Sequence, residues 1–288
     1  MRKPKHMHSI AFGALKMIMD TFDEFKRKAL KETDMWWARH VIRKFSSRIS
    51  WFLVRRCPNI TPNQVTIFST FVGFIGAFLF FIGDYKYAVV AAVVLFLWNI
   101  TDGVDGEIAR YKKMKSVSGL FLELTLDILV LIFCFLGIIF LVYKNTNSIF
   151  ILIVGLLDIT FFLFYRLADA SKFWALFLSG KSQIDIQLSL KQVKQDYKFS
   201  NGSLIQIGRF IDKMGWNLYY SGHIVPMILF FSLIDSIFQP KVMLYTFPIT
   251  SLSIFLILYI IFIPLTMFRI SVHFITLKIG EGGSHDEN

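Results

Sequence analysis

The sequence has few cysteines, and long stretches between its two ends contain almost no charged residues. Only two cysteines, Cys57 and Cys134, occur among 288 residues, and they form no Cys-x-x-Cys pair. Neither a disulfide framework nor a cysteine zinc site is therefore indicated. Charged residues make up 18% of the chain, whereas 55% is hydrophobic and 32 residues are phenylalanine. This composition excludes an ordinary soluble domain and is typical of a helical membrane protein.

Long apolar runs predict an all-α polytopic membrane protein with six transmembrane helices. Each run has roughly 17 to 25 residues, which is the length that crosses a bilayer as a helix. The first run begins only after residue 60, so we expect no cleavable signal peptide. The predicted spans are 63–82, 85–109, 118–143, 148–165, 218–237 and 243–268.

Basic residues set the predicted orientation. The net charge of +11 comes from lysines and arginines that flank the apolar runs. Anionic headgroups and the positive-inside rule favour such positions. We therefore expect membrane lipids as partners and no nucleic acid. Both termini are predicted to face the cytoplasm, in a bacterial or archaeal cytoplasmic membrane or an ER-type membrane.

The chain is predicted to have three parts. Residues 1–60 mix aromatic and apolar residues with basic ones, which suits an amphipathic arm in the membrane interface. A soluble helical arm remains the alternative. Residues 61–275 would form the six-span domain, with Thr61 as N-cap and Pro62 as its first helical residue. A disordered tail is expected at 276–288, and the polar segment 171–213 is expected to be loop with short helix.

Four carboxylates lie at the ends of two apolar runs. Asp102 and Asp105 are three residues apart, and Glu123 and Asp127 are four apart, so each pair projects from one helix face. A short loop centred near residue 114 should make the two spans antiparallel. Asp102 should then lie level with Asp127, and Asp105 level with Glu123. The four groups would converge on one cavity near the cytoplasmic edge.

Carboxylates that converge in this way need a compensating charge. One or two divalent cations with oxygen preference, Mg²⁺, Mn²⁺ or Ca²⁺, are the expected partners. Gly106 and Ala109 remove side-chain bulk on the same helix, and Arg110 offers a planar cation suited to a phosphate. These features together indicate a diphosphate site. Packing between helices is the alternative for the small residues, and it is the preferred interpretation of Gly119.

A continuous motif contains these residues. The sequence Asp-x-x-Asp-Gly-x-x-Ala-Arg begins at Asp102, and Gly-x-x-x-Glu-x-x-x-Asp begins at Gly119 after eight intervening residues. The motif resembles the signature of the CDP-alcohol phosphatidyltransferase family at every defined position except Glu123, where the family has aspartate. The entry to the first span, Thr61 to Thr66, also resembles this family, so the likeness extends over about residues 58–140.

The resemblance implies a reaction and roles for residues. Asp102, Asp105 and Glu123 would be the main metal ligands, and Asp127 the general base, although Asp127 could also bind metal. Gly106, Ala109 and Arg110 would lie beside the CDP group. A CDP-linked donor, CDP-diacylglycerol in most of the family, would give its phosphoalcohol group to a hydroxyl acceptor and release CMP. Serine, inositol phosphate and glycerol phosphate are acceptors to consider, and a homodimer is the family expectation.

Glu123 leaves further alternatives open. Its extra methylene moves the carboxylate by about 1.5 Å relative to aspartate, enough to alter metal spacing. A catalytically altered relative is therefore one alternative. A membrane prenyltransferase also binds a diphosphate through aspartates, but with another spacing. A cation transporter would place its carboxylates near the membrane midplane, whereas these lie near an edge.

Overall fold

The computed structural model describes residues 20–30, 38–178, 221–238, 242–244 and 247–261. The Trp36-Trp37 pair, most of the polar segment and the tail predicted to be disordered lie outside these ranges. The described residues are almost entirely helical. They divide into two units, 1–147 with 225–252, and 148–224 with 253–288. Each unit is described separately below.

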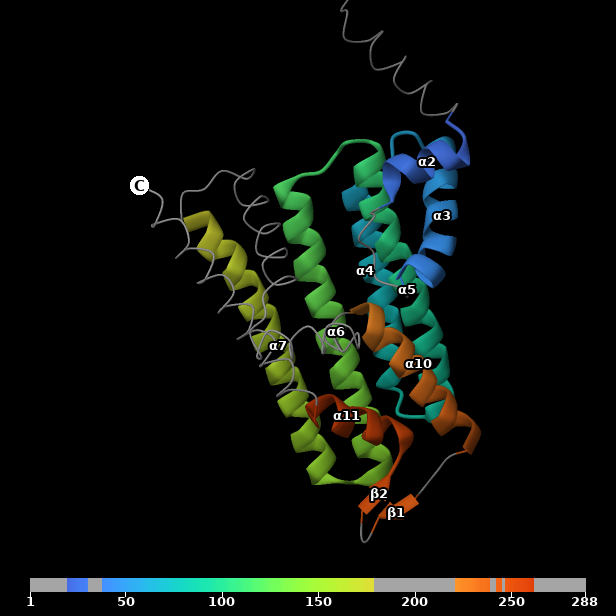
Figure 1. Ribbon diagram of the computed structural model, residues 1–288. Coiled ribbons are helices and arrows are strands. Elements are labelled where there is room, and N and C mark those ends of the chain that lie inside the picture. Colours follow the sequence, from blue (N-terminus) through green and yellow to red (C-terminus); the bar gives the residue numbers. More distant parts are fainter. Residues whose placement is uncertain (1–19, 31–37, 179–220, 239–241, 245–246, 262–288) are drawn as a thin grey trace, which may run out of the picture. The chain divides into compact units, whose positions relative to one another are not determined.

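The first unit contains three long helices and a shorter N-terminal group (Figure 1). The short group precedes the first predicted span, and the long helices follow the predicted spans closely. The bounds are α2 Phe22–Ala29, η1 Ala38–Ile42, α3 Arg43–Arg56, α4 Pro62–Phe80, α5 Tyr85–Tyr111 and α6 Val117–Thr146.

The entry to α4 forms as the sequence predicts. Thr61 is extended and caps the helix, with its hydroxyl accepting from the Gln64 N–H while the Gln64 side chain accepts from the Thr61 N–H. Pro62 takes the first turn, where its missing N–H has no intrahelical partner to lose. This reciprocal cap fixes the start of the first membrane helix.

Small residues let α5 and α6 pack closely on α4. A Cβ placed on Gly73 would lie 2.7 Å from Val130 of α6 and 3.0 Å from Trp98 of α5. A Cβ on Gly76 would meet Leu95 at 2.9 Å. These approaches are too close for a methyl group, so α4 has a glycine surface against both neighbours.

Helix α3 buries polar side chains and exposes apolar ones, which is the reverse of a helix on the surface of a soluble protein. It buries Ser46, Ser47 and Ser50, whereas Phe45 and Phe52 are 49% and 56% exposed. Exposed apolar side chains beside exposed arginines suit a helix whose outer face lies in lipid at the membrane interface. Whether the arm lies in the membrane interface stays a prediction.

The later part of the chain differs from the sequence prediction in two places. Helix α7, Ile149–Leu178, continues past residue 165, the predicted end of the fourth span, and through 171–178, where loop with short helix was predicted. The run 243–268 does not begin as a helix. Strands β1 Val242–Leu244 and β2 Phe247–Ile249 pair antiparallel, and α11 Ser251–Ile261 follows. Pro248, which lacks an N–H, disfavours a helix at that point.

Among the described residues, four helices are long and apolar enough to cross a membrane, which indicates an integral membrane protein. They are α4, α5, α6 and residues 149–168 of α7. The fifth and sixth predicted spans correspond to the shorter helices α10, Ser221–Phe238, and α11. Residues 218–220 and 262–268 of those spans lie outside the described ranges, so a total of six remains a prediction.

Candidate active site

The motif lies on two consecutive antiparallel helices. Helix α5 carries Asp102 and Asp105 in its last turns, and α6 carries Glu123 and Asp127 in its first turns. Helix α5 ends at Tyr111 and α6 begins at Val117, so the connection is centred at residue 114, as predicted. Lys113 adopts a left-handed φ of 57° in this short connection.

The four carboxylates are electrostatic neighbours. Asp102 experiences the charge of Asp127 most strongly, followed by Asp105 and Glu123, and Arg43 is its cationic neighbour. Asp105 in turn has Glu123 as its carboxylate neighbour. Asp102 is thus a neighbour of Asp127, and Asp105 of Glu123, as expected for two antiparallel helices in a hairpin. The buried Oδ1 of Asp102 has no hydrogen-bond donor among the described residues.

Asp105 is held by the protein at both oxygens. The Thr66 hydroxyl of α4 donates to Oδ2 at 2.5 Å, and the Gly106 backbone N–H donates to Oδ1. Asp105 is only 3% exposed and Thr66 4%. The rotamer of this carboxylate is therefore fixed before any ligand arrives.

The metal roles of these residues stay predictions. Within the described ranges, no three acidic, histidine or cysteine side chains converge closely enough to hold a metal ion. Glu123 and Asp127 are partly exposed on α6, whereas Asp105 is buried on α5.

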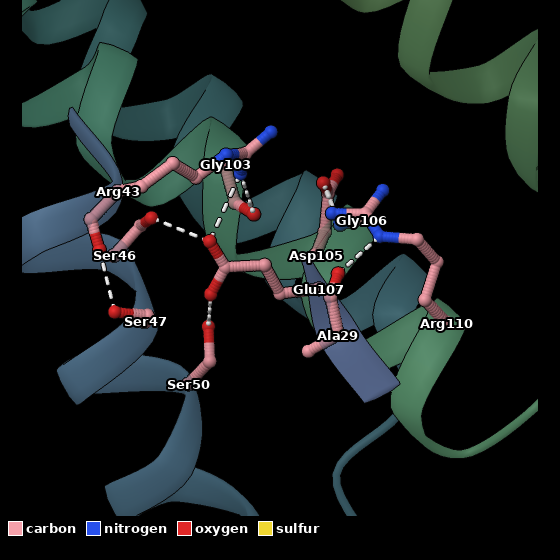
Figure 2. Close-up of polar contacts among 10 residues, drawn as sticks. All are labelled: Ala29, Arg43, Ser46, Ser47, Ser50, Gly103, Asp105, Gly106, Glu107 and Arg110. Carbon is pink, nitrogen blue, oxygen red and sulfur yellow. Dashed lines mark hydrogen bonds and ion pairs between the residues drawn. The ribbon is translucent and has the colours of Figure 1, made fainter. Parts of the chain in front are cut away.

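Arg110 contacts the N-terminal arm. Its Nε donates to the carbonyl of Ala29, the last residue of α2 (Figure 2). A Cβ on Gly106 would lie 3.1 Å from Arg110 Nη1, so the glycine leaves room for this guanidinium. Ala109, one turn beyond Gly106, is partly exposed. Donor binding by Gly106, Ala109 and Arg110 stays a prediction.

Glu107, an undefined position of the motif, is a buried anchor for α3. Its side chain is fully buried, and Oε1 lies 2.9 Å from Arg43 Nη1 and 2.6 Å from Ser46 Oγ. Ser50 donates to Oε2 at 2.7 Å. Arg43 also donates to the Gly103 carbonyl at 3.1 Å, beside Asp102 (Figure 2). These contacts hold α3 of the arm against α5. On α5 they involve Gly103 and Glu107, which lie between Asp102 and Arg110 in the motif.

Two further residues, Tyr111 and Lys112, fasten the arm to the end of α5. The Tyr111 hydroxyl donates to Asp20 at 2.7 Å, and the Tyr111 ring lies 4.8 Å from the ring of Phe25. Lys112 donates to the carbonyls of Pro58 and Ile60, both at 2.6 Å, and burial lowers the pKa of this lysine.

The interpretation of Gly119 as a packing residue fits its surroundings. Its N–H donates to Ser116, the N-cap of α6. A Cβ at this position would lie 2.9 Å from Ser116 Oγ and 3.0 Å from Asn63 Oδ1. A side chain here would therefore have to displace the side chains of Ser116 and Asn63.

Asp158 stands apart from the motif. It belongs to α7 in the second unit and is fully buried, and neither carboxylate oxygen has a hydrogen-bond partner within the described ranges. A buried carboxylate in a membrane helix is a candidate functional residue. Nothing described in its own unit indicates a ligand.

The sequence prediction did not assign roles to Thr66, Arg43 or Glu107. One signal was present for Glu107, since Arg43, Ser46 and Ser50 occupy positions i, i+3 and i+7 of one helix face in an otherwise apolar and basic arm. Such a polar stripe needs a buried partner, and an acidic residue inside the motif supplies it. The contact between Thr66 and Asp105 depends on how α4 and α5 are placed together, which helix periodicity does not give.

Comparison with known proteins agrees with the motif. Residues 59–188 match the CDP-alcohol phosphatidyltransferase family. Relatives named bifunctional IPC transferase and DIPP synthase are 33% identical over 117 residues in Thermococcus kodakarensis and 34% identical over 146 residues in Archaeoglobus fulgidus. The alignments cover 38% and 48% of this chain, but only 26% and 28% of those relatives. The resemblance inferred from the motif is confirmed over residues 59–188, which match the CDP-alcohol phosphatidyltransferase family model.

Proposed function

We propose that this protein transfers a phosphoalcohol group, phosphatidyl in the simplest case, from a CDP-linked donor to a hydroxyl acceptor and releases CMP. The observation that supports this most is the family motif on two facing helices, where Asp102 has three carboxylate neighbours and a buried oxygen without a donor among the described residues. A buried anion in such company requires a cation.

The residues fit one or two divalent cations. All the candidate ligands are carboxylate oxygens, which Mg²⁺ and Mn²⁺ prefer. Asp102, Asp105 and Glu123 would hold the cation. Asp127 would also contribute, since its charge acts on Asp102. When bound, such a cation neutralises the diphosphate of the donor and the charge that develops on the leaving phosphate.

The protein's own residues would then position and activate the reactants. Asp127 accepts the proton of the acceptor hydroxyl, and that oxygen attacks the phosphorus that bears the transferred alcohol. A new P–O bond forms as the bond to the CMP phosphate breaks, and CMP leaves with the electron pair. The donor would lie beside Gly106 and Ala109 of α5, where the guanidinium of Arg110 next to Gly106 offers a positive charge to its phosphates.

We place this site on the cytoplasmic side of the membrane. The connection after α5 carries Lys112, Lys113 and Lys115. Basic loops stay on the cytoplasmic side, and the carboxylates lie within the last turns of α5 and the first turns of α6 next to this loop. A water-soluble acceptor would therefore approach from the cytosol.

The product identifies the reaction. Full-length protein in detergent would be incubated with CDP-diacylglycerol, Mg²⁺ or Mn²⁺, and serine, inositol phosphate or glycerol phosphate in turn, followed by mass spectrometry of the lipids. A new lipid whose mass equals the acceptor plus the phosphatidyl group is expected with one acceptor. The enzyme could instead give no product with CDP-diacylglycerol but a product with diacylglycerol and a CDP-linked alcohol. That result would show that the lipid is the acceptor and the CDP-linked alcohol the donor.

A further inference from the structure

Asp105 accepts a hydrogen bond from a side chain on another helix. Thr66 lies on the second turn of α4, and its hydroxyl is 2.5 Å from Asp105 Oδ2 and 3.2 Å from the Pro62 carbonyl. A hydroxyl has one proton, and the shorter contact to a charged acceptor takes it. The distance is typical of a hydroxyl that donates to a carboxylate, which is among the stronger hydrogen bonds in proteins.

We propose that Thr66 is a positioning residue for the metal site, because it fixes the orientation of the Asp105 carboxylate. This inference rests on the proposed function. Oδ1 is already turned toward the Gly106 N–H, so the two donors together set the plane of the carboxylate. Each oxygen keeps a further lone pair, and a fixed plane directs those lone pairs toward one place.

Thr66 lies in a buried polar stretch of α4. The Thr66 backbone carbonyl accepts from Ser69 Oγ at 2.9 Å and from Thr70 Oγ1 at 2.8 Å. Thr66, Ser69 and Thr70 are all buried. Water has little access to compete for Asp105, so a lost hydroxyl at position 66 is not replaced easily.

Thr70 provides a matched control. It lies one turn beyond Thr66 on the same helix and is also buried, but its hydroxyl donates to a backbone carbonyl and not to a carboxylate of the motif. Valine has nearly the shape of threonine and no hydroxyl. Thr66→Val and Thr70→Val therefore make the same chemical change, and only the first removes a donor from Asp105.

The expected effect is on metal affinity. Partners that orient metal ligands typically contribute about 10- to 100-fold in affinity or activity. We expect Thr66→Val to weaken Mn²⁺ binding about 10-fold or more. Thr66→Ser, which restores the hydroxyl, should bind close to wild type, and Thr70→Val should not change affinity.

Mn²⁺ binding to the full-length protein in detergent, measured by the loss of the free-Mn²⁺ electron paramagnetic resonance signal, tests this without turnover. Equal affinity of wild type and Thr66→Val would overturn the role of Thr66 and leave the proposed function intact. No Mn²⁺ binding by wild type would overturn the metal site and the inference together. Thermal unfolding of each variant identifies misfolding, and Thr66→Ala then replaces a Val variant that does not fold.

Discussion

The buried contact between Glu107 and the arm leads to a sharp prediction about stability. Glu107→Gln keeps the size of the side chain but removes the charge that pairs with Arg43 at 2.9 Å. Breaking a buried ion pair by removing one partner costs about 3 to 5 kcal/mol. The Arg43 side chain is 14% exposed, so water compensates part of the loss and the lower end, about 3 kcal/mol, applies.

This loss translates into a measurable shift in thermal unfolding. For chains of this size, 1 kcal/mol changes Tm by about 2 to 4 °C, so we expect Glu107→Gln to unfold about 6 to 12 °C below wild type. Differential scanning fluorimetry in one detergent gives the value. Lys44→Met, which removes an exposed charge next to Arg43, should shift Tm by no more than about 2 °C.

A double variant separates the ion pair from packing. Replacing both partners by apolar residues, Arg43→Met with Glu107→Met, leaves no unpaired buried charge and should recover part of the loss. A Tm for Glu107→Gln that equals the Lys44→Met value would refute the reasoning, since the carboxylate would then not be paired as described. Further destabilisation in the double variant would show that the site requires the charges themselves.

Three further predictions concern the site and its packing. Asp127→Asn should abolish CMP release while CDP-diacylglycerol still binds in a filter assay, and retained turnover would remove Asp127 as the base. Glu123→Asp should keep activity and shift the preference between Mg²⁺ and Mn²⁺, whereas a dead variant would mean that the site has been rebuilt around glutamate. Gly73→Ala should lower Tm by overpacking against Val130 at 2.7 Å, at a cost of about 1 to 3 kcal/mol, and an unchanged Tm would contradict that contact.

The sequence predicted the parts of this fold that depend on local chemistry. Apolar run lengths placed α4, α5 and α6 to within three residues at each end. The Thr61-Pro62 step predicted the helix start because capping and the missing N–H of proline act within one turn. Helical periodicity also predicted which carboxylates would be neighbours, since a short hairpin leaves little freedom in register.

Tertiary contacts were the part that local patterns did not predict. The arm was expected to be a separate part of the chain, but Glu107 and Arg110 hold its helices against α5. Those contacts depend on the position of α2 and α3 relative to the motif, and nothing in their own periodicity specifies it. The strands at 242–249 were missed because a long apolar run outweighed the effect of Pro248.

CMP release by the purified full-length protein is the most direct test of the proposed transfer. CDP-diacylglycerol, the acceptor identified by mass spectrometry and Mg²⁺ or Mn²⁺ would be supplied, with Asp127→Asn and a metal chelator as controls. We expect CMP to appear only when donor, acceptor and metal are all present, and to be absent with Asp127→Asn. CMP release that persists without metal, or at an undiminished rate in Asp127→Asn, would contradict the assignment of the motif as the catalytic site.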